Sequence, residues 1–394
     1  GQVAWVVENM YFNVFIYRMF RASARDISVM VAASAVAATL TTLFIGALSD
    51  KLGKRRLFIA GGYILWGISI WSFALIRTDV IEKIFPAAAS AASVGVSLVI
   101  IMDCVMTFFG SSANDACFNA WPTDATNRGS AEGINAMMPL IAILAVFGGF
   151  MPFDLDKSSS WVTIYTIIGA VVLAVGIAGL FLIKDGEVKP AAENGNYFRN
   201  IFYGFCPSVV RENRILYTVL GAFAVFGISI QIFMPYLILY YSVSLGMDDY
   251  VLVMAPAIVI AAVTTVLFGK LYDRRGFRMT VLPALALLAA GYVVLFFFRS
   301  TAPVFIGSLL MMSGYLAGMA VFGAMLRDYT PPHRAGMFQG LRIVGQVLVP
   351  GIIGPAIGAA VLRGAGTVLN GDGTTSFVPN RNIFLAALIA AVAV

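Results

Sequence analysis

Long apolar segments, separated by short polar loops, fill most of this sequence of 394 residues. Only 12% of the residues are charged and the mean hydropathy is +0.89, whereas a soluble domain carries about 25% charged residues. Because a soluble fold cannot bury so much apolar surface, lipid is the expected solvent. A chain in lipid must satisfy its own backbone hydrogen bonds, which leaves helices or closed barrels. The apolar segments are continuous rather than alternating, so the expected fold class is an all-α integral membrane protein.

Twelve apolar segments are candidates for membrane-spanning helices, each of which needs roughly 20 residues. They lie at 3–23, 27–49, 57–77, 87–113, 132–153, 161–183, 215–240, 250–271, 280–298, 303–326, 337–361 and 382–394. The last segment is shorter than a span and the sequence opens inside an apolar run, so we expect the native protein to extend beyond both ends.

A charged stretch from Lys184 to Arg214 separates the sixth apolar segment from the seventh. It mixes Lys, Arg, Asp and Glu with a proline and an Asn-Gly pair, which is typical of an exposed linker. We therefore expect an N-terminal six-helix bundle at 1–183, a cytoplasmic linker at 184–214 and a C-terminal six-helix bundle at 215–394.

Two short motifs occur in both halves of the chain. The run GALSDKLGKRR at 46–56, after the second segment, returns in weaker form as GKLYDRRGFRM at 269–279, after the eighth. The order Asp, Thr, Arg, Glu/Gln-Gly follows the fourth segment, from Asp124, and the tenth segment, from Asp328. Two repeats at matching places indicate a duplication related by an axis along the membrane normal. We expect such a bundle to hold a cavity between its halves, near the bilayer midplane.

The net charge of +6 comes from Lys and Arg in short loops rather than from a continuous basic face, so nucleic acid is not an expected partner. The loops after the even-numbered segments carry most of these cations, and the opposite loops are more acidic. This pattern predicts that those loops and both termini lie in the cytoplasm, in a multi-pass protein of the plasma or inner membrane. Arg18, Arg21 and Arg25, near the first outer loop, are exceptions.

The motif at 46–56 closely resembles the signature between helices 2 and 3 of the major facilitator superfamily, and its second copy lies where that family carries one. The resemblance covers the whole chain. It implies twelve transmembrane helices in two pseudo-symmetric six-helix bundles. It also implies a cytoplasmic latch between the halves, whose expected gating residues are Asp50, Lys54, Arg55, Asp124, Arg128, Asp273 and Arg274. The alternative is that the cations of these loops only set the topology.

The run from Asn114 to Asp124 resembles the corresponding stretch of the glycoside and sugar–cation symporter branch and of its sucrose-transporter-like relatives. Sodium-coupled members of that branch carry paired aspartates on helix 2. Here the second segment has no acid between Ser28 and Ser49, which favours proton coupling. Drug antiporters carry an Arg in helix 4 and a Gly-Pro signature in helix 5. Here helix 4 lacks the Arg, and a Gly-Pro run occurs only in the eleventh segment, at Gly354-Pro355. An exporter or facilitator of an amphipathic solute is the alternative.

Ionisable side chains inside a span are costly and are candidates for function. Three acids, Glu8, Asp103 and Asp115, are the expected proton-coupling residues. Asp103 also begins a polar stripe at helical spacing that continues through Thr107, Ser111 and Asn114. The alternatives are an interfacial position for Glu8, an outer-surface position for Asp103, and a structural ion pair between Asp115 and Arg342.

A hydroxyl-rich ligand is the expected substrate, because the helices that line the family's cavity carry amides, aromatic rings and one guanidinium. Asn9 and Asn13, one turn apart, are expected to share a face. The expected substrate-binding residues are Asn9, Asn13, Asn114, Asn119, Trp121, Gln231, Tyr236, Tyr240, Arg342 and Gln346. The alternative for the amides is adhesion between helices, and for the aromatic residues it is packing.

Several classes of protein are disfavoured by what the sequence lacks. Cys104, Cys117 and Cys206 have no metal-ligand spacing, and His333, the only histidine, follows two prolines in a loop. The sequence contains no cofactor motif and no nucleophile–base pattern that would suggest an enzyme. The expected function is therefore secondary active transport of a small polar solute, a sugar or glycoside, with H⁺ as coupling ion, by a monomer in the lipid bilayer. A non-transporting sensor on the same scaffold is a weaker alternative.

Overall fold

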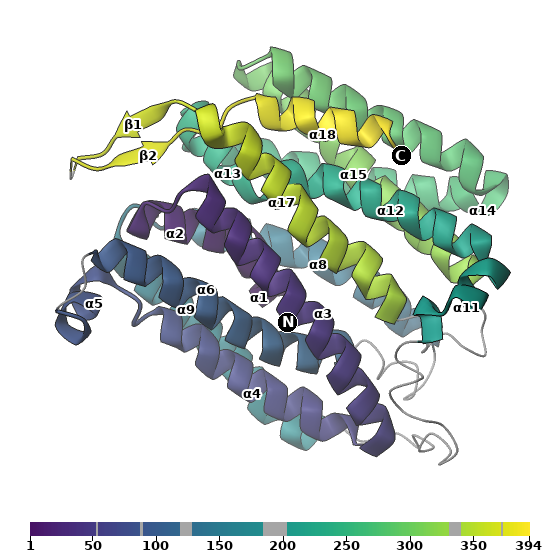
Figure 1. Cartoon of the computed structure of the whole chain (residues 1–394), viewed down its shortest axis with the longest axis horizontal. Helices are drawn as coiled ribbons and strands as arrows, with labels where there is room; N and C mark the ends of the chain where they lie inside the picture. The colour runs from purple at the N-terminus through teal and green to yellow at the C-terminus, as the bar shows by residue number, and fades with distance from the viewer. Residues whose placement is uncertain (53, 87–89, 119–127, 184–202, 331–339, 372) are drawn as a thin grey trace. The chain divides into compact units, whose positions relative to one another are not determined.

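The computed structural model describes residues 1–52, 54–86, 90–118, 128–183, 203–330, 340–371 and 373–394, without side chains at 47, 50, 128–137, 139 and 203. The chain divides into two compact units, Gly1–Tyr203 and Gly204–Val394. Each unit is built almost entirely of long helices (Figure 1).

Unit 1 contains six long helical segments that match the first six predicted spans. The first consists of α1 (Gln2–Val6), the π-helical turn η1 (Val7–Tyr11) and α2 (Phe12–Phe20). The others are α3 (Ala24–Leu52), α4 (Arg55–Phe73), α6 (Ala91–Gly110) with its π-helical extension η2 (Ser111–Phe118), α8 (Arg128–Phe150) and α9 (Ser158–Leu182). A short helix, α5 (Thr78–Ile84), lies between α4 and α6 and was not predicted.

Local chemistry explains how the first two spans meet at a sharp turn. Helix α2 ends at Arg21, which adopts the left-handed conformation with φ of 56°. The amide of Ala22 then donates to the carbonyl of Ile16 at 3.2 Å, which satisfies a carbonyl at the helix end. The chain can therefore reverse within three residues and enter α3.

Glycines allow α4 and α9 to pack closely in unit 1. A Cβ placed on Gly67 would lie 2.6 Å from the amide nitrogen of Leu173, and one on Gly176 would lie 2.6 Å from that of Ile64. Only glycine fits such backbone contacts, which are typical of helix pairs in membranes.

Unit 2 holds the remaining helices and one hairpin. Its elements after the 3-10 turn η3 (Tyr203–Phe205) are α11 (Pro207–Glu212), α12 (Arg214–Phe233), η4 (Met234–Tyr236), α13 (Leu237–Leu239), η5 (Tyr240–Ser244), α14 (Tyr250–Phe297), α15 (Thr301–Tyr329), η7 (Val344–Leu348), α17 (Val349–Val361), η8 (Leu362–Gly364), β1 (Thr367–Leu369), β2 (Thr375–Phe377) and α18 (Asn382–Val392).

Helix α14 is two spans rather than one. Its 48 residues would extend about 72 Å as a straight helix, more than twice the hydrocarbon thickness of a bilayer. Gly276, with φ of 74°, breaks the helix within the repeated loop motif. The two parts match the predicted spans 250–271 and 280–298.

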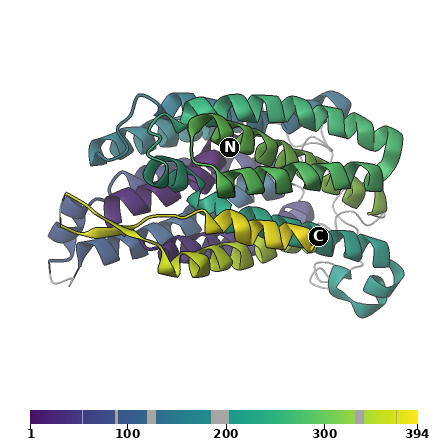
Figure 2. The ribbon, with the colours of Figure 1, turned by 90° about the horizontal axis from the view of Figure 1, so that it is seen from above.

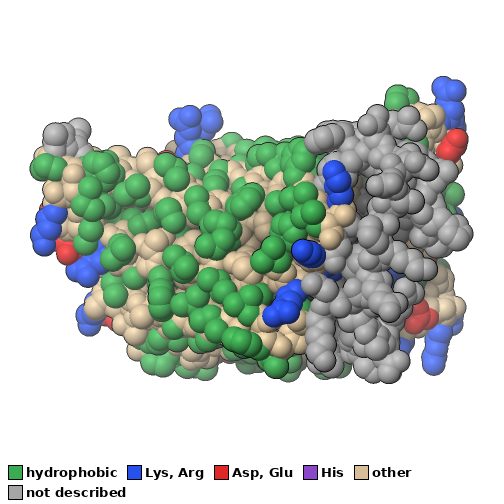
Figure 3. Space-filling view, turned by 90° about the horizontal axis from the view of Figure 1, so that it is seen from below, with side chains coloured by type: hydrophobic (Ala, Val, Ile, Leu, Met, Phe, Trp, Pro, Cys, Tyr) green, Lys and Arg blue, Asp and Glu red, His purple; other side chains and the backbone are tan. Residues whose placement is uncertain are grey.

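The spans add up to the predicted twelve within the described residues. Eight helices are long and apolar enough to cross a membrane, and one of these is the double helix α14. Two shorter apolar helices, Leu140–Phe150 and Asn382–Val392, and the interrupted N-terminal helix complete the set. Apolar side chains spread over the face shown in Figure 3, and its charged side chains are few. The sequence prediction of an all-α membrane fold is confirmed.

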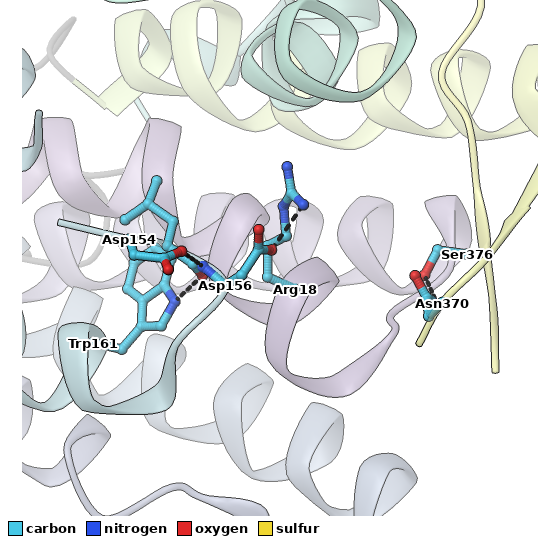
Figure 4. Close-up of polar contacts among 7 residues, drawn as sticks. Arg18, Asp154, Asp156, Trp161, Asn370 and Ser376 are labelled. Atoms are coloured by element: carbon cyan, nitrogen blue, oxygen red, sulfur yellow. Dashed lines mark hydrogen bonds and ion pairs between the residues drawn. The ribbon is translucent and has the colours of Figure 1, made fainter. Parts of the chain in front are cut away.

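The hairpin β1–β2 was not predicted. Its strands pair in antiparallel register, with Val368 opposite Ser376, and the hairpin projects from the ends of α17 and α18 (Figure 2). Asn370 donates a hydrogen bond of 2.9 Å to the hydroxyl of Ser376 (Figure 4). Three-residue strands in a polar loop carry too little pattern for a prediction from sequence.

Candidate functional site

Three spans of unit 1 bring polar side chains to one buried point. Glu8, on η1, is 7% exposed, and its Oε1 accepts hydrogen bonds from Ser34 of α3 at 2.7 Å and from Thr107 of α6 at 2.8 Å. The hydroxyl oxygens of Ser34 and Thr107 are themselves 2.8 Å apart. We call these three side chains the Glu8 ring.

Asp103 lies beside the Glu8 ring, one turn before Thr107 on α6. It is 2% exposed and close enough to Glu8 to interact with it electrostatically. Oδ1 of Asp103 and Oε2 of Glu8 are buried without a hydrogen-bond partner among the described residues. Unpartnered buried carboxylate oxygens are uncommon, because their desolvation is not compensated.

The polar stripe predicted on the fourth span is buried inside unit 1. Asp103, Thr107, Ser111 and Asn114 are all at most 2% exposed. Their spacing of four, four and three residues puts them on one side of the helix, as the sequence indicated. Asp103 is thus not at the outer surface, and Glu8 is not an exposed interfacial residue.

Asp115 forms a second polar group on the π-helical turn η2. It accepts hydrogen bonds from Ser111 at 3.0 Å and from the amide of Asn114 at 3.1 Å. The hydroxyl of Tyr63, on α4, donates to the other end of the Asn114 side chain at 3.2 Å. Asp115 is near enough to contribute to the electrostatic potential at Glu8, so the two groups form one polar region.

The two asparagines of the first span do not share a face, which corrects the sequence prediction. Asn9 is exposed and donates to the carbonyl of Trp5 at 2.8 Å. Asn13 is 1% exposed and donates to the carbonyl of Asn9 at 3.1 Å. Asn9 lies within the π-helical turn η1 and Asn13 follows on α2, and the wider winding of this turn changes the phase of the helix.

No lysine or arginine neutralises the three acids within the part of the chain that the structure describes. Glu8, Asp103 and Asp115 take part in no ion pair there. An ionised carboxylate in such a place is costly unless a cation or several donors compensate it. Proton uptake removes that cost. No group of three or more metal-ligating side chains occurs among the described residues either.

Sequence reasoning missed Ser34 and Tyr63. Ser34 is one of several hydroxyl residues of α3, among them Thr39 and Thr41, and the sequence does not distinguish it from the others. Tyr63 is on α4, which the family resemblance does not assign to the cavity. The hydroxyl groups of Ser34 and Tyr63 matter because they face the acids of neighbouring helices. Finding them from the sequence would require knowing which helix faces are in contact.

The predicted binding residues of unit 2 are largely occupied by contacts within that unit. The hydroxyls of Tyr236 and Tyr240 donate to the carbonyls of Pro355 at 3.3 Å and Leu295 at 3.5 Å. Gln231 is half-buried and its side chain packs against Gly354. Arg342 is exposed and Gln346 is half-buried. Their roles in binding stay predictions.

The predicted gating residues are only partly visible. Asp124 lies outside the described residues, as do the side chains of Asp50 and Arg128. Asn119 and Trp121, predicted to bind substrate, also lie outside the described residues. Lys54, Asp273 and Arg274 are exposed, and Arg55 is buried. A contact that was not predicted joins the second motif to the end of α15, because the Tyr272 hydroxyl donates to Asp328 at 2.5 Å.

One of the cations that oppose the predicted topology has an acidic partner. Arg18 forms an ion pair of 2.8 Å with Asp156, in the loop between α8 and α9 (Figure 4). Trp161, in the first turn of α9, donates to the carbonyl of Leu155 in the same loop at 2.9 Å. The charge of Arg18 is therefore locally balanced.

The sequence was compared with known families, curated proteins and solved structures. The family model described as Major Facilitator Superfamily matches residues 3–355. The chain belongs to the major facilitator superfamily. No curated protein matches the sequence.

Several solved structures share the superfamily fold with this chain. The nucleoside transporter NupG is 12% identical, with a TM-score of 0.70 over 100% of this chain and 94% of its own. A bacterial homologue of the human lysosomal transporter Spinster is 14% identical, with a TM-score of 0.69 over 100% and 94%. The xylose transporter XylE from E. coli is 15% identical, with a TM-score of 0.64 over 100% and 96%. These identities establish the fold alone. The superfamily membership makes this chain a multi-pass membrane transporter, not an enzyme.

Proposed function

We propose that this transporter moves a small polar organic solute, a sugar or glycoside, in symport with protons, by alternating access across the cell membrane. One observation carries the coupling part of the proposal: Glu8 and Asp103 are neighbouring buried carboxylates, each with an unpartnered oxygen, and neither has a cationic partner in the described chain. Two carboxylates in one site disfavour each other's ionisation. Proton binding would let the loaded carrier change its conformation without a buried charge.

The solute part of the proposal draws on structures with the same fold and on the polar and aromatic groups of unit 1. Among the structures with the same fold, NupG is named as a transporter of nucleosides and XylE as a transporter of xylose, and both kinds of solute are rich in hydroxyl groups. In unit 1 the amides of Asn13 and Asn114 and the paired rings of Trp5 and Trp66, with centroids 4.9 Å apart, are the types of group that such solutes contact. We assign Asn9, Asn119 and Trp121 and the polar residues of unit 2 to the same role.

The remaining assignments follow the sequence argument. Asp115 would be a third coupling acid, and the two copies of the loop motif would gate the cytoplasmic side. We propose cytoplasmic termini and a functional monomer. A carrier that exports or equilibrates an amphipathic solute is the alternative.

The test is a measurement of external pH in lightly buffered, de-energised proteoliposomes during addition of a panel of sugars and nucleosides. Alkalinisation on adding one solute, lost in Glu8→Gln or Asp103→Asn, is expected. Asp79→Asn is the matched control, because it neutralises an exposed carboxylate that pairs with Arg77. Solute uptake without proton movement in folded protein would overturn the coupling, and no movement of any hydroxyl-rich solute would favour the alternative.

A further inference from the structure

The Glu8 ring has three oxygen–oxygen contacts at hydrogen-bond distance, but its two hydroxyl groups carry only two hydrogens. Oε1 of Glu8 and the hydroxyl oxygens of Ser34 and Thr107 are separated by 2.7, 2.8 and 2.8 Å. All three distances are those of O–H···O hydrogen bonds. A serine and a threonine have one hydroxyl hydrogen each. If both donate to Glu8, the contact between Ser34 and Thr107 has no hydrogen.

A third hydrogen on Glu8 completes the ring. The carboxylic acid then donates to one hydroxyl, that hydroxyl donates to the second, and the second donates back to Oε1. The other carboxyl oxygen, Oε2, becomes the carbonyl oxygen of a neutral acid. Leaving it without a partner, as observed, costs less than leaving a charged oxygen without one.

A metal ion at the centre of these oxygens fits the distances less well. Oxygen ligands about 2.4 Å from an ion in octahedral geometry lie roughly 3.4 Å from one another. The three oxygens of the Glu8 ring are closer together than that. The geometry therefore favours a proton.

We propose that the coupling proton resides on Glu8 as the third hydrogen of this ring, and that Ser34 and Thr107 are positioning residues that make the site select a proton over a sodium ion. This inference rests on the proposed function and deepens it. Glu8 and Asp103 then have different roles: Glu8 holds the proton within the ring, and Asp103 has an unpartnered oxygen beside the ring.

The titratable groups around Glu8 are known from each packed element. Asp103 and Cys104 on α6 and Asp115 on η2 interact with Glu8 itself. Tyr63 on α4 interacts with Asp115, and Tyr165 on α9 interacts with Asp103. Helix α3 has no titratable group between Ile27 and Ser49. The described side chains of α8, which are Met138 and Leu140–Phe150, include no titratable group either. None of these groups supplies a positive charge to Glu8.

The test is infrared spectroscopy of the purified protein in nanodiscs, titrated over pH in the absence of solute. A carbonyl stretching band of a protonated carboxylic acid is expected, and it should disappear in Glu8→Gln. The band should shift in frequency in Thr107→Val, which keeps the side-chain shape but lacks the hydroxyl. Thr107→Ser should restore the wild-type frequency. Ser34→Ala and Ser34→Thr form a second pair of the same design.

The same variants should change the pH at which Glu8 releases its proton. Loss of the Thr107 hydroxyl removes a charge-assisted hydrogen bond from the ionised acid and a weaker one from the neutral acid. Thr107→Val is therefore expected to retain its proton to about one pH unit higher than wild type, with recovery in Thr107→Ser.

Three outcomes would overturn the inference. These are a band that survives in Glu8→Gln, a band that does not respond to the hydroxyl variants, or solute uptake driven by a sodium gradient in place of a proton gradient. The spectroscopy needs no transport, so a protein that moves no sugar but shows the Glu8 band contradicts the proposed function and not the ring.

Discussion

The hydroxyl of Thr107 donates a hydrogen bond of 2.8 Å to the carboxylate of Glu8, across 99 positions of the chain. This contact joins the first and fourth spans of unit 1, and Ser34 adds the second span to it. Any movement among these three helices changes the environment of Glu8, because the three side chains form one ring. A buried acid whose partners come from different helices is suited to couple proton binding to helix movement.

Replacing Asp103 by Asn should stabilise the protein and impair coupling. The substitution removes a buried carboxylate that has an unpartnered oxygen and no cationic partner in the described chain. We expect a gain of about 1 kcal/mol in the free energy of unfolding, which corresponds to about 2–4 °C in melting temperature. Thermal unfolding in detergent measures this, with Asp79→Asn expected to change it by less than about 0.5 kcal/mol. A marked loss of stability would show that Asp103 has a structural partner.

Replacing Gly67 by Ala should loosen the packing of α4 on α9. The added Cβ would meet the amide nitrogen of Leu173 at 2.6 Å, so the helices must separate. We expect a loss of about 1–3 kcal/mol in the free energy of unfolding. Gly61→Ala is the matched control on the same helix, since nothing lies within 4 Å of its Cβ position, and it should stabilise by about 0.5–1 kcal/mol. Equal effects of both substitutions would contradict the close approach.

Replacing Tyr272 by Phe should release the second loop motif from the end of α15. The lost hydrogen bond joins the Tyr272 hydroxyl to the carboxylate of Asp328, at 2.5 Å and partly exposed to solvent. We expect a cost of about 0.5–1.5 kcal/mol and faster hydrogen–deuterium exchange in residues 270–279. The variant Asp328→Asn, measured alone and with Tyr272→Phe, completes a double-mutant cycle, and additive effects would argue against a direct contact.

The loop between α8 and α9 should depend on pH through Asp154. The backbone amide of Asp156 donates to Asp154 at 3.1 Å and Lys157 pairs with it at 3.1 Å, and these contacts lower the pKa of this exposed carboxyl below its usual 3.8 (Figure 4). A lowered pKa in the folded state means that the stabilising contribution is present above pH 3.8 and is lost as pH falls through the lower, folded value.

Amide exchange at Asp156 measures this dependence. The variant Asp154→Asn should exchange faster than wild type at neutral pH, and the difference should vanish in acid. A difference that persists unchanged in acid would mean that the charge of Asp154 is not involved.

Sequence alone determined the spans, the duplication and the stripe on the fourth helix. Each rests on information that is local in the chain: continuous hydropathy for the spans, repeated motifs for the halves, and spacing of four, four and three for Asp103, Thr107, Ser111 and Asn114. Lipid makes these local signals strong, because a spanning helix must satisfy its backbone by itself.

Only the tertiary structure decided which polar side chains meet. Ser34 carries no signal within α3, and it becomes part of a site because that turn of α3 faces Glu8 and Thr107. The π-helical turn η1, which contains Asn9, places Asn9 and Asn13 on different faces, and the pattern of residues does not reveal it. Both outcomes depend on how helices rotate and wind when they pack. Contacts between residues far apart in the chain determine the rotation and winding of each helix, and no local sequence pattern contains those contacts.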